Sequence, residues 1–124
     1  MATTKIKAIK STLNKAINYI IDPEKTDESL LVSSYGCSVE FADLEMQATE
    51  AKGSGRGNRV AYHFIQSFAP DDPLTPEQAH EIGKAFADKY LKGKYEYVIA
   101  THVDKGHIHN HIIFNATSFT NYKK

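Results

Sequence analysis

A chain of 124 residues is long enough to bury one hydrophobic core and too short for two domains of ordinary size. Its composition, 41% hydrophobic and 24% charged, is typical of a soluble globular domain, and no apolar run is long enough to span a bilayer. The formal net charge of zero gives no overall attraction to nucleic acid, and the single cysteine, Cys37, excludes an internal disulfide and a thiolate metal site. A reducing cytoplasm is the expected compartment.

The charges are unevenly distributed along the chain. The segment from Asp22 to Glu50 holds eight acidic residues and one basic residue, Lys25. Basic residues gather at the N-terminus, around the 53–58 loop and again further on: Lys5, Lys7, Lys10, Lys15, Lys52, Arg56, Arg59, Lys89, Lys92 and Lys94. A local basic face is therefore compatible with the neutral total.

The N-terminal segment predicts a strand followed by a helix. Lys5–Ile9 alternates polar and apolar residues, as a strand does. Ser11 or Thr12 can cap a helix that runs to about Ile21 and ends before Pro23. Its apolar face would be formed by Leu13, Ala16, Ile17 and Ile20.

Weaker patterns follow in the acidic segment. Leu30–Ser34 favours a short strand, and Glu40–Lys52 has helical spacing of its apolar residues Phe41, Leu44, Ala48 and Ala51. The glycine-rich stretch Gly53–Asn58 is typical of a flexible loop that carries positive charge.

The second half of the chain carries clearer signals. Val60–Phe68 is rich in β-branched and aromatic residues and predicts a strand. Thr75, Pro76 and Gln78 form a capping box at the start of a helix that ends near Leu91. Tyr95–His102 and His107–Ala116 predict two strands joined as an antiparallel hairpin. The expected fold class is α+β, an antiparallel β-sheet flanked by helices.

Four of the six histidines lie in the stretch H-V-D-K-G-H-I-H-N-H-I-I-F-N, which begins at His102. Strand alternation places His107, His109, His111 and Asn115 on one face, and Ile108, Ile112 and Phe114 on the other. Same-face neighbours are roughly 6.7 Å apart along a strand, so an ion could be shared by the pair 107/109 or the pair 109/111. Imidazoles without a thiolate suit a divalent metal such as Zn, Mn, Ni or Co.

The same stretch resembles the three-histidine motif of the relaxases, the HUH-type, MobA/VirD2-like mobilisation endonucleases of conjugative plasmids and transposons. Their pattern H-x-D, four residues, H-x-H, three residues, Asn matches His102, Asp104, His109, His111 and Asn115. The residue between the paired histidines is normally hydrophobic but is Asn110 here. The spacing favours His102, His109 and His111 as metal ligands, with His107 as a neighbour that binds DNA or moves a proton.

Two further segments resemble motifs of this family. Tyr62-His63 followed by Q-S-F-A-P-D-D resembles a motif in which a serine at a strand end contacts DNA, which would be Ser67, with His63 on the same face. The segment A-I-N-Y-I-I-D-P-E-K-T resembles the motif that carries the nucleophile, which would be Tyr19.

The resemblance implies a DNA relaxase that nicks and rejoins single-stranded DNA at an origin of transfer through a 5′-phosphotyrosyl intermediate. It implies one divalent metal ion (Mg, Mn, Zn or similar), accessory relaxosome proteins as partners, and Asp104 as a group that orients His102 or accepts the phenolic proton. His63, Ser67 and Asn115 would line the DNA-binding face of the sheet. Backbone contacts would come from Arg56 and Arg59, and stacking from Tyr95 and Tyr97 if their face is open.

Two other functions remain compatible with the sequence. Rolling-circle replication initiators share the histidine pair but usually place the tyrosine after it, where this chain has Tyr122. A non-enzymatic module that binds metal or nucleic acid is the third alternative. Relaxases usually continue well past the third motif, so residues 1–124 are expected to be a catalytic core, the N-terminal fragment of a longer protein.

Overall fold

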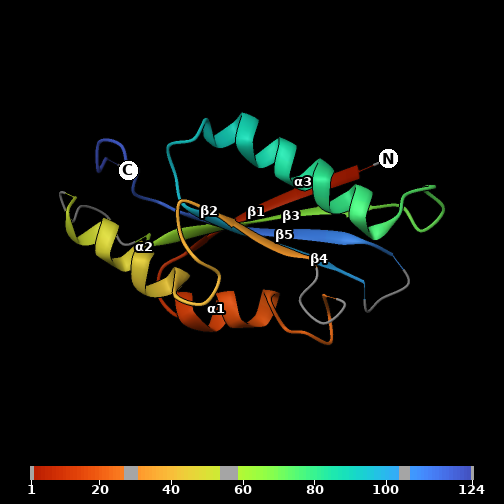
Figure 1. The fold of residues 1–124 in the computed structure, drawn as a ribbon, viewed down its shortest axis with the longest axis horizontal. Coiled ribbons are helices and arrows are strands. Elements are labelled where there is room, and N and C mark those ends of the chain that lie inside the picture. Colours follow the sequence, from red (N-terminus) through yellow and green to blue (C-terminus); the bar gives the residue numbers. More distant parts are fainter. Residues whose placement is uncertain (1, 27–30, 54–58, 104–106, 124) are drawn as a thin grey trace.

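The computed structural model describes residues 2–26, 31–53, 59–103 and 107–123, which form a sheet with helices on both of its faces (Figure 1). The elements follow one another as β1 (Ala2–Ile9), α1 (Leu13–Ile20), β2 (Val32–Tyr35), α2 (Ala42–Ala51), β3 (Ala61–Phe68), α3 (Pro76–Leu91), β4 (Tyr97–His102) and β5 (His109–Asn115). The strands are ordered β1-β3-β5-β4-β2, and every neighbouring pair is antiparallel. The expected α+β class is confirmed.

The sheet separates two hydrophobic clusters. α1 and α2 lie on one face and α3 on the other (Figure 1). On the α1/α2 face, Ile113 of β5 belongs to a cluster with Ile17 and Ile20 of α1. On the α3 face, Ile112 and Phe114 pack with residues of α3. The alternation expected for β5 is therefore present, but helices cover both faces, so the histidine-bearing face also carries a core.

α1 is positioned by its apolar stripe. Leu13, Ile17 and Ile20 are buried as the spacing predicts. Thr12 occupies the N-cap position with a left-handed φ of 60°, and its hydroxyl donates to the Ser11 carbonyl rather than accepting from the helix. The expected side-chain cap is thus not formed, and the helix is stabilised by packing on the sheet.

The buried face predicted for α2 was wrong. Phe41 and Leu44 are exposed, whereas Ala42, Met46 and Thr49 are buried. The helix carries two partial apolar stripes, and Ala42 and Met46 of the buried one pack in the cluster with Ile17 of α1. Only tertiary packing chooses between such stripes.

α3 begins as the sequence predicts. The Thr75 hydroxyl accepts from the Gln78 backbone N–H at 3.1 Å, and the Gln78 side chain accepts from the Thr75 N–H at 2.9 Å. The helix ends at Leu91, followed by Lys92 and Gly93 in left-handed conformations. Among the described residues, no helix is both long enough and apolar enough to cross a membrane.

Candidate active site

The register of the β4–β5 hairpin brings three histidines together. His102 of β4 pairs directly with His109 of β5, and His111 lies two residues further along β5 opposite Ala100. Directly paired residues share a sheet face, so all three imidazoles lie under α1. Their nitrogens lie within 4.8 Å of one another, and all three side chains are buried.

Hydrogen bonds hold these rings in place. His102 Nε2 donates to the Ile20 carbonyl of α1 at 2.9 Å. His111 Nε2 lies 2.8 Å from His109 Nδ1, and His111 Nδ1 lies 2.8 Å from His63 Nε2 of β3. The cluster therefore includes a fourth imidazole, His63, on the side of His111 that faces away from His109.

Burial keeps the inner histidines neutral. It lowers the pKa of His111 to about 2, with smaller contributions from the charges of the neighbouring histidines and of Lys7. Burial also lowers the pKa of His63 to about 4, and Lys7 and His102 add to the effect. Since only a neutral imidazole can bind a metal, both rings are ready to act as a ligand or as a partner of one.

The donor set fits a divalent cation. Three imidazole nitrogens with no thiolate suit Zn, Mn, Co or Ni and leave coordination positions open for substrate oxygens. Metal-binding histidines usually bond through their second ring nitrogen to a carbonyl or another polar group. Here the Ile20 carbonyl is that partner for His102, and His63 is that partner for His111. His102, His109 and His111 are thus suited to hold one ion.

Tyr19 of α1 lies against this cluster. Its ring centroid is 5.9 Å from that of His102 and 6.4 Å from that of His111, in edge-on contacts. The side chain is 52% exposed, because it lies beside the buried stripe of α1 and not on it. The ammonium of Lys25 lies 5.3 Å from the ring centroid. A half-exposed phenol, a cation and three imidazoles therefore meet at one place.

The remaining candidate residues fall into different positions. Ser67 pairs with His109 and is half-buried on the histidine-bearing face. The His107 ring centroid is 5.1 Å from that of His109, and His107 is half-buried. Arg59 is exposed just before β3. Arg56 and Asp104 lie outside the described residues.

Asn115 lies at the far end of β5 and is fully buried. Its amide donates to the Met46 carbonyl and to Glu96, and its oxygen accepts from the Thr117 N–H. With these bonds it ties β5 to α2 and to the chain beyond the sheet. The expected contact of Asn115 with DNA stays a prediction, and the bonds of its side chain show a structural role.

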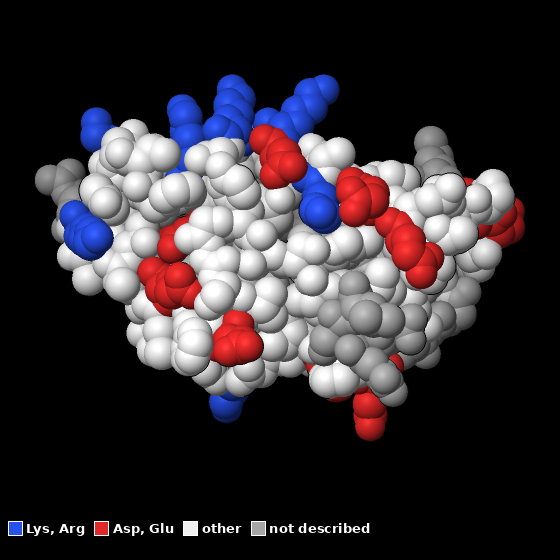
Figure 2. Space-filling view, in the orientation of Figure 1, with Lys and Arg blue, Asp and Glu red and all other residues white. Residues whose placement is uncertain are grey.

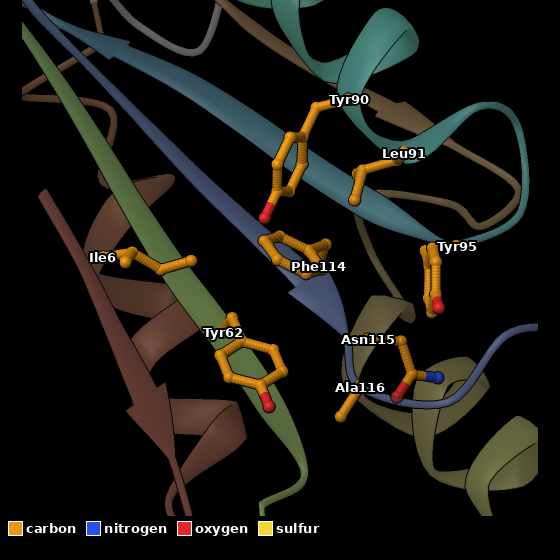
Figure 3. Close-up of a pocket in the computed structure, with 8 residues that line it drawn as sticks. All are labelled: Ile6, Tyr62, Tyr90, Leu91, Tyr95, Phe114, Asn115 and Ala116. Atoms are coloured by element: carbon orange, nitrogen blue, oxygen red, sulfur yellow. The ribbon is translucent and has the colours of Figure 1, made fainter. Parts of the chain in front are cut away.

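The two tyrosines considered for base stacking lie away from the histidines. Tyr97 is buried, and its hydroxyl donates to Asp88. Tyr95 lines a cavity of about 480 Å³ on the α3 face, together with Tyr62, Tyr90 and Phe114 (Figure 3). The whole sheet separates that cavity from the histidine cluster.

A chain of buried polar side chains lies behind the histidines, on the α3 face. His80 of α3 contacts Ser33 at 2.7 Å through Nε2 and Thr101 at 2.8 Å through Nδ1. Thr101 donates to Asn110, whose amide donates to Gln66 and to the Ala79 carbonyl. Because Thr101 and Asn110 stand directly beside the histidine pair in the ladder, this chain clamps the two strands that carry the histidines.

α3 approaches the sheet closely at this point. A Cβ atom added at Gly83 would lie 2.5 Å from Ile99 Cδ1 and 2.6 Å from Asn110 Nδ2, so a larger residue there would force these side chains to shift. Asn110 takes the position that is usually hydrophobic in the resembled motif, and its side chain bonds to Thr101 of β4, Gln66 of β3 and the Ala79 carbonyl of α3. Alternation could have placed it on the α3 face, but nothing local to the sequence identifies His80 as its partner through Thr101.

Two further lysines lie near the site and were not singled out from the sequence. Lys25 lies over Tyr19, and Lys7 of β1 pairs with His63. Strand alternation from Lys5 to Ile9 was a usable signal for Lys7, but the pairing of β1 with β3 had to be known. Lys25 follows the end of the helix and Pro23, and no local pattern in the sequence predicts its contact with the Tyr19 ring.

Comparisons with known proteins agree on one family. Residues 19–124 match the family model described as "Relaxase: MobA/VirD2-like, nuclease domain". The chain is 43% identical over 131 residues to the group II intron-interrupted relaxase LtrB of Lactococcus lactis subsp. cremoris, which covers 86% of this chain and 23% of that protein. It is 38% identical over 125 residues to protein rlx of Staphylococcus aureus, which covers 100% of this chain and 35% of that protein. The chain thus spans about a quarter to a third of the length of these relatives.

Proposed function

The chain belongs to the relaxase family, with a nuclease domain of the MobA/VirD2-like type, and from this premise we propose that it nicks and rejoins one strand of single-stranded DNA by transesterification. The substrate would be the nick region of an origin of transfer, and accessory relaxosome proteins would be its partners. One divalent metal ion, held by His102, His109 and His111, would be its cofactor.

The observation that carries this proposal is the position of Tyr19. Its ring contacts those of two candidate metal ligands, His102 and His111, while about half of the side chain faces solvent. A tyrosine that served only to pack would lie on the buried stripe of α1 with Ile17 and Ile20. The contact of the Tyr19 ring with the histidines, together with its exposure, supports its hydroxyl as the group that would attack a phosphate bound there.

The reaction exchanges one phosphoester for another. The Tyr19 oxygen attacks the phosphorus, the bond from phosphorus to the 3′ oxygen of the preceding nucleotide breaks, and the 5′ phosphate stays on the tyrosine. The phenolic proton passes to a base, and the departing 3′ oxygen takes up a proton. Because one ester replaces another, the free 3′ hydroxyl can attack the phosphotyrosine and restore the strand.

The residues of the chain supply the other requirements. A tyrosine hydroxyl is a weak nucleophile until its proton is removed, and we assign that step to Asp104 or to His107 at the edge of the cluster. When bound, the metal ion polarises the scissile phosphate and offsets its charge. Lys25 places a second positive charge beside the nucleophile. Ser67 and His107 lie beside His109 and would contact the strand. Arg59, exposed before the opposite end of β3, would contact the strand further along, whereas the buried His63 would orient His111.

The test is the capture of a covalent adduct. Incubation with pools of short single-stranded DNA and Mn²⁺ or Mg²⁺ should give a phosphotyrosyl peptide that spans Tyr19, detected by mass spectrometry. Tyr19→Phe should abolish the adduct without loss of folding or metal binding. Tyr122→Phe is the matched control and should leave it intact, because Tyr122 lies beside Lys52 near the end of α2. An adduct on Tyr122 would support a replication initiator, and metal or DNA binding without any adduct would support a binding module.

A further inference from the structure

An open groove runs between β1 and α1 on the side of Tyr19 that faces the N-terminal strand. It has a volume of about 560 Å³. Its charged and polar lining residues are Lys7, Lys10, Ser11, Thr12, Lys15, Tyr19 and His63. No acidic side chain lines it among the described residues. The groove therefore combines a positive lining with the proposed nucleophile.

The topology explains why the lysines meet there. Lys7 stands on β1 opposite His63 of β3, so its side chain leaves the sheet on the histidine-bearing face. Lys10 follows the end of β1, and Lys15 lies on the first turn of α1. Lys15 and Tyr19 are four residues apart in one helix and so project from the same side. All three lysines are exposed, and neither α1 nor β1 contains an acidic residue that could face them.

We infer that this groove binds the phosphate backbone of single-stranded DNA and guides the strand to Tyr19. The inference rests on the proposed function, because that function supplies the strand. Three exposed cations in an acid-free groove suit a polyanion, and single-strand binding proteins use positive grooves that follow the backbone. The charge of Lys7 is also felt inside the cluster, where it helps to lower the pKa of His63.

The α3 side of the molecule offers a matched comparison. Basic side chains gather along that side as well, where α3 and the loop after it lie (Figure 2). Lys84, Lys89 and Lys94 belong to this set, and they lie across the sheet from Tyr19. The aromatic cavity lies on the same side (Figure 3). Each set contains three lysines, so neutralising either set removes the same positive charge. A difference in DNA binding between the two variants would therefore show that the position of the charge matters, and not only its amount.

The experiment measures equilibrium binding without chemistry. A labelled oligo(dT) of about 16 nucleotides is titrated with protein in EDTA at several salt concentrations, by fluorescence anisotropy. The variant Lys7→Gln/Lys10→Gln/Lys15→Gln should lower the slope of log affinity against log salt by about 0.7 per lysine, or roughly 2 in all. At about 0.1 M salt this corresponds to roughly fivefold weaker binding per lysine and about a hundredfold for the triple variant.

The control variant Lys84→Gln/Lys89→Gln/Lys94→Gln should keep the slope and the affinity of the native chain. Equal losses of affinity in both triple variants would contradict the assignment of DNA binding to this groove. A loss of affinity confined to the control variant would indicate that DNA binds on the α3 side instead. Absence of oligo(dT) binding by the native chain would also overturn it. Because metal and cleavage take no part, the adduct at Tyr19 tests the proposed function separately.

Discussion

At the residue scale, the identity of the third metal ligand separates two arrangements of the same histidines. His111 lies with His102 and His109 in one cluster of nitrogens, whereas His107 contacts only the outer side of His109. His111→Ala should therefore reduce the affinity for Mn²⁺ or Zn²⁺ by at least tenfold, because a direct ligand is lost. Isothermal titration calorimetry measures this directly.

The matched variant is His107→Ala, which should change the affinity by no more than a few fold. Both variants remove one imidazole from the same strand region, so nonspecific effects on folding are comparable. The opposite pattern, with binding lost in His107→Ala and kept in His111→Ala, would replace the proposed triad with His102, His107 and His109.

The buried histidines also predict how stability depends on pH. The pKa values of His63 and His111 are lowered by burial to about 4 and about 2, whereas the unfolded chain has a value near 6.5. The unfolded state therefore binds more protons below pH 6.5. The stability that these neutral rings contribute is complete above that pH and is lost as pH falls. Each group contributes a slope of up to about 1.4 kcal/mol per pH unit.

Urea denaturation of the metal-free protein at pH 7, 6 and 5 should show this decline in the free energy of unfolding. His63→Gln removes one titrating group and should make the decline shallower, even if the variant is less stable at pH 7. A stability that is constant from pH 7 to pH 5 would show that the rings are not neutral and buried in solution.

At the element scale, the hairpin that carries the histidines is clamped from behind. Thr101 accepts from His80 and donates to Asn110, so Thr101→Val leaves two buried polar groups without a partner. Each such group costs about 1–3 kcal/mol, so the free energy of unfolding should fall by a few kcal/mol. The affinity for metal should fall about tenfold, because the pair His102 and His109 stands next to the broken link.

The control for this variant lies at the end of the neighbouring strand, β5. Asn115→Ala breaks buried hydrogen bonds to Met46 and Glu96 and should also reduce stability, but its distance from the histidines should leave metal affinity unchanged. Thr101→Ser keeps the hydroxyl and should restore metal affinity. Equal metal affinities in Thr101→Val and Asn115→Ala would show that the clamp serves stability alone.

Local patterns in the sequence predicted the individual helices and strands better than the contacts between them. Strand alternation and the capping box at Thr75 depend on neighbouring residues, and both are present in the structure, although the strand expected over His107–Ala116 spans His109–Asn115. The buried stripe of α2 could not be chosen, because two stripes compete in the sequence. The burial of His63 against His111 could not be foreseen either, because it depends on β3 pairing with β5 across 48 positions.

At the scale of the whole molecule, the candidate metal site connects elements that are far apart in the chain. Its ligands come from β4 and β5, which are interior strands of the sheet. The Nε2–H of His102 also donates a hydrogen bond to the carbonyl of Ile20, the last residue of α1. α1 in turn packs on the sheet through Ile17 and Ile20 and carries Tyr19. An ion held at this point would tie the centre of the sheet to the helix that bears the nucleophile.

Metal binding should therefore stabilise the entire fold and not only the hairpin. At a free metal concentration of about 100 times Kd, the folded state gains about 2.7 kcal/mol. For a chain of this length the midpoint of thermal unfolding should rise by roughly 10 °C, and EDTA should reverse the change. Differential scanning calorimetry with Mn²⁺ measures it. At the same metal concentration His111→Ala, with at least tenfold weaker binding, should gain about 1.4 kcal/mol or less, which is about half of the native rise. If the variant gained as much as the native chain, the stabilising ion would be bound elsewhere, and the link between the histidines and α1 would lose its support.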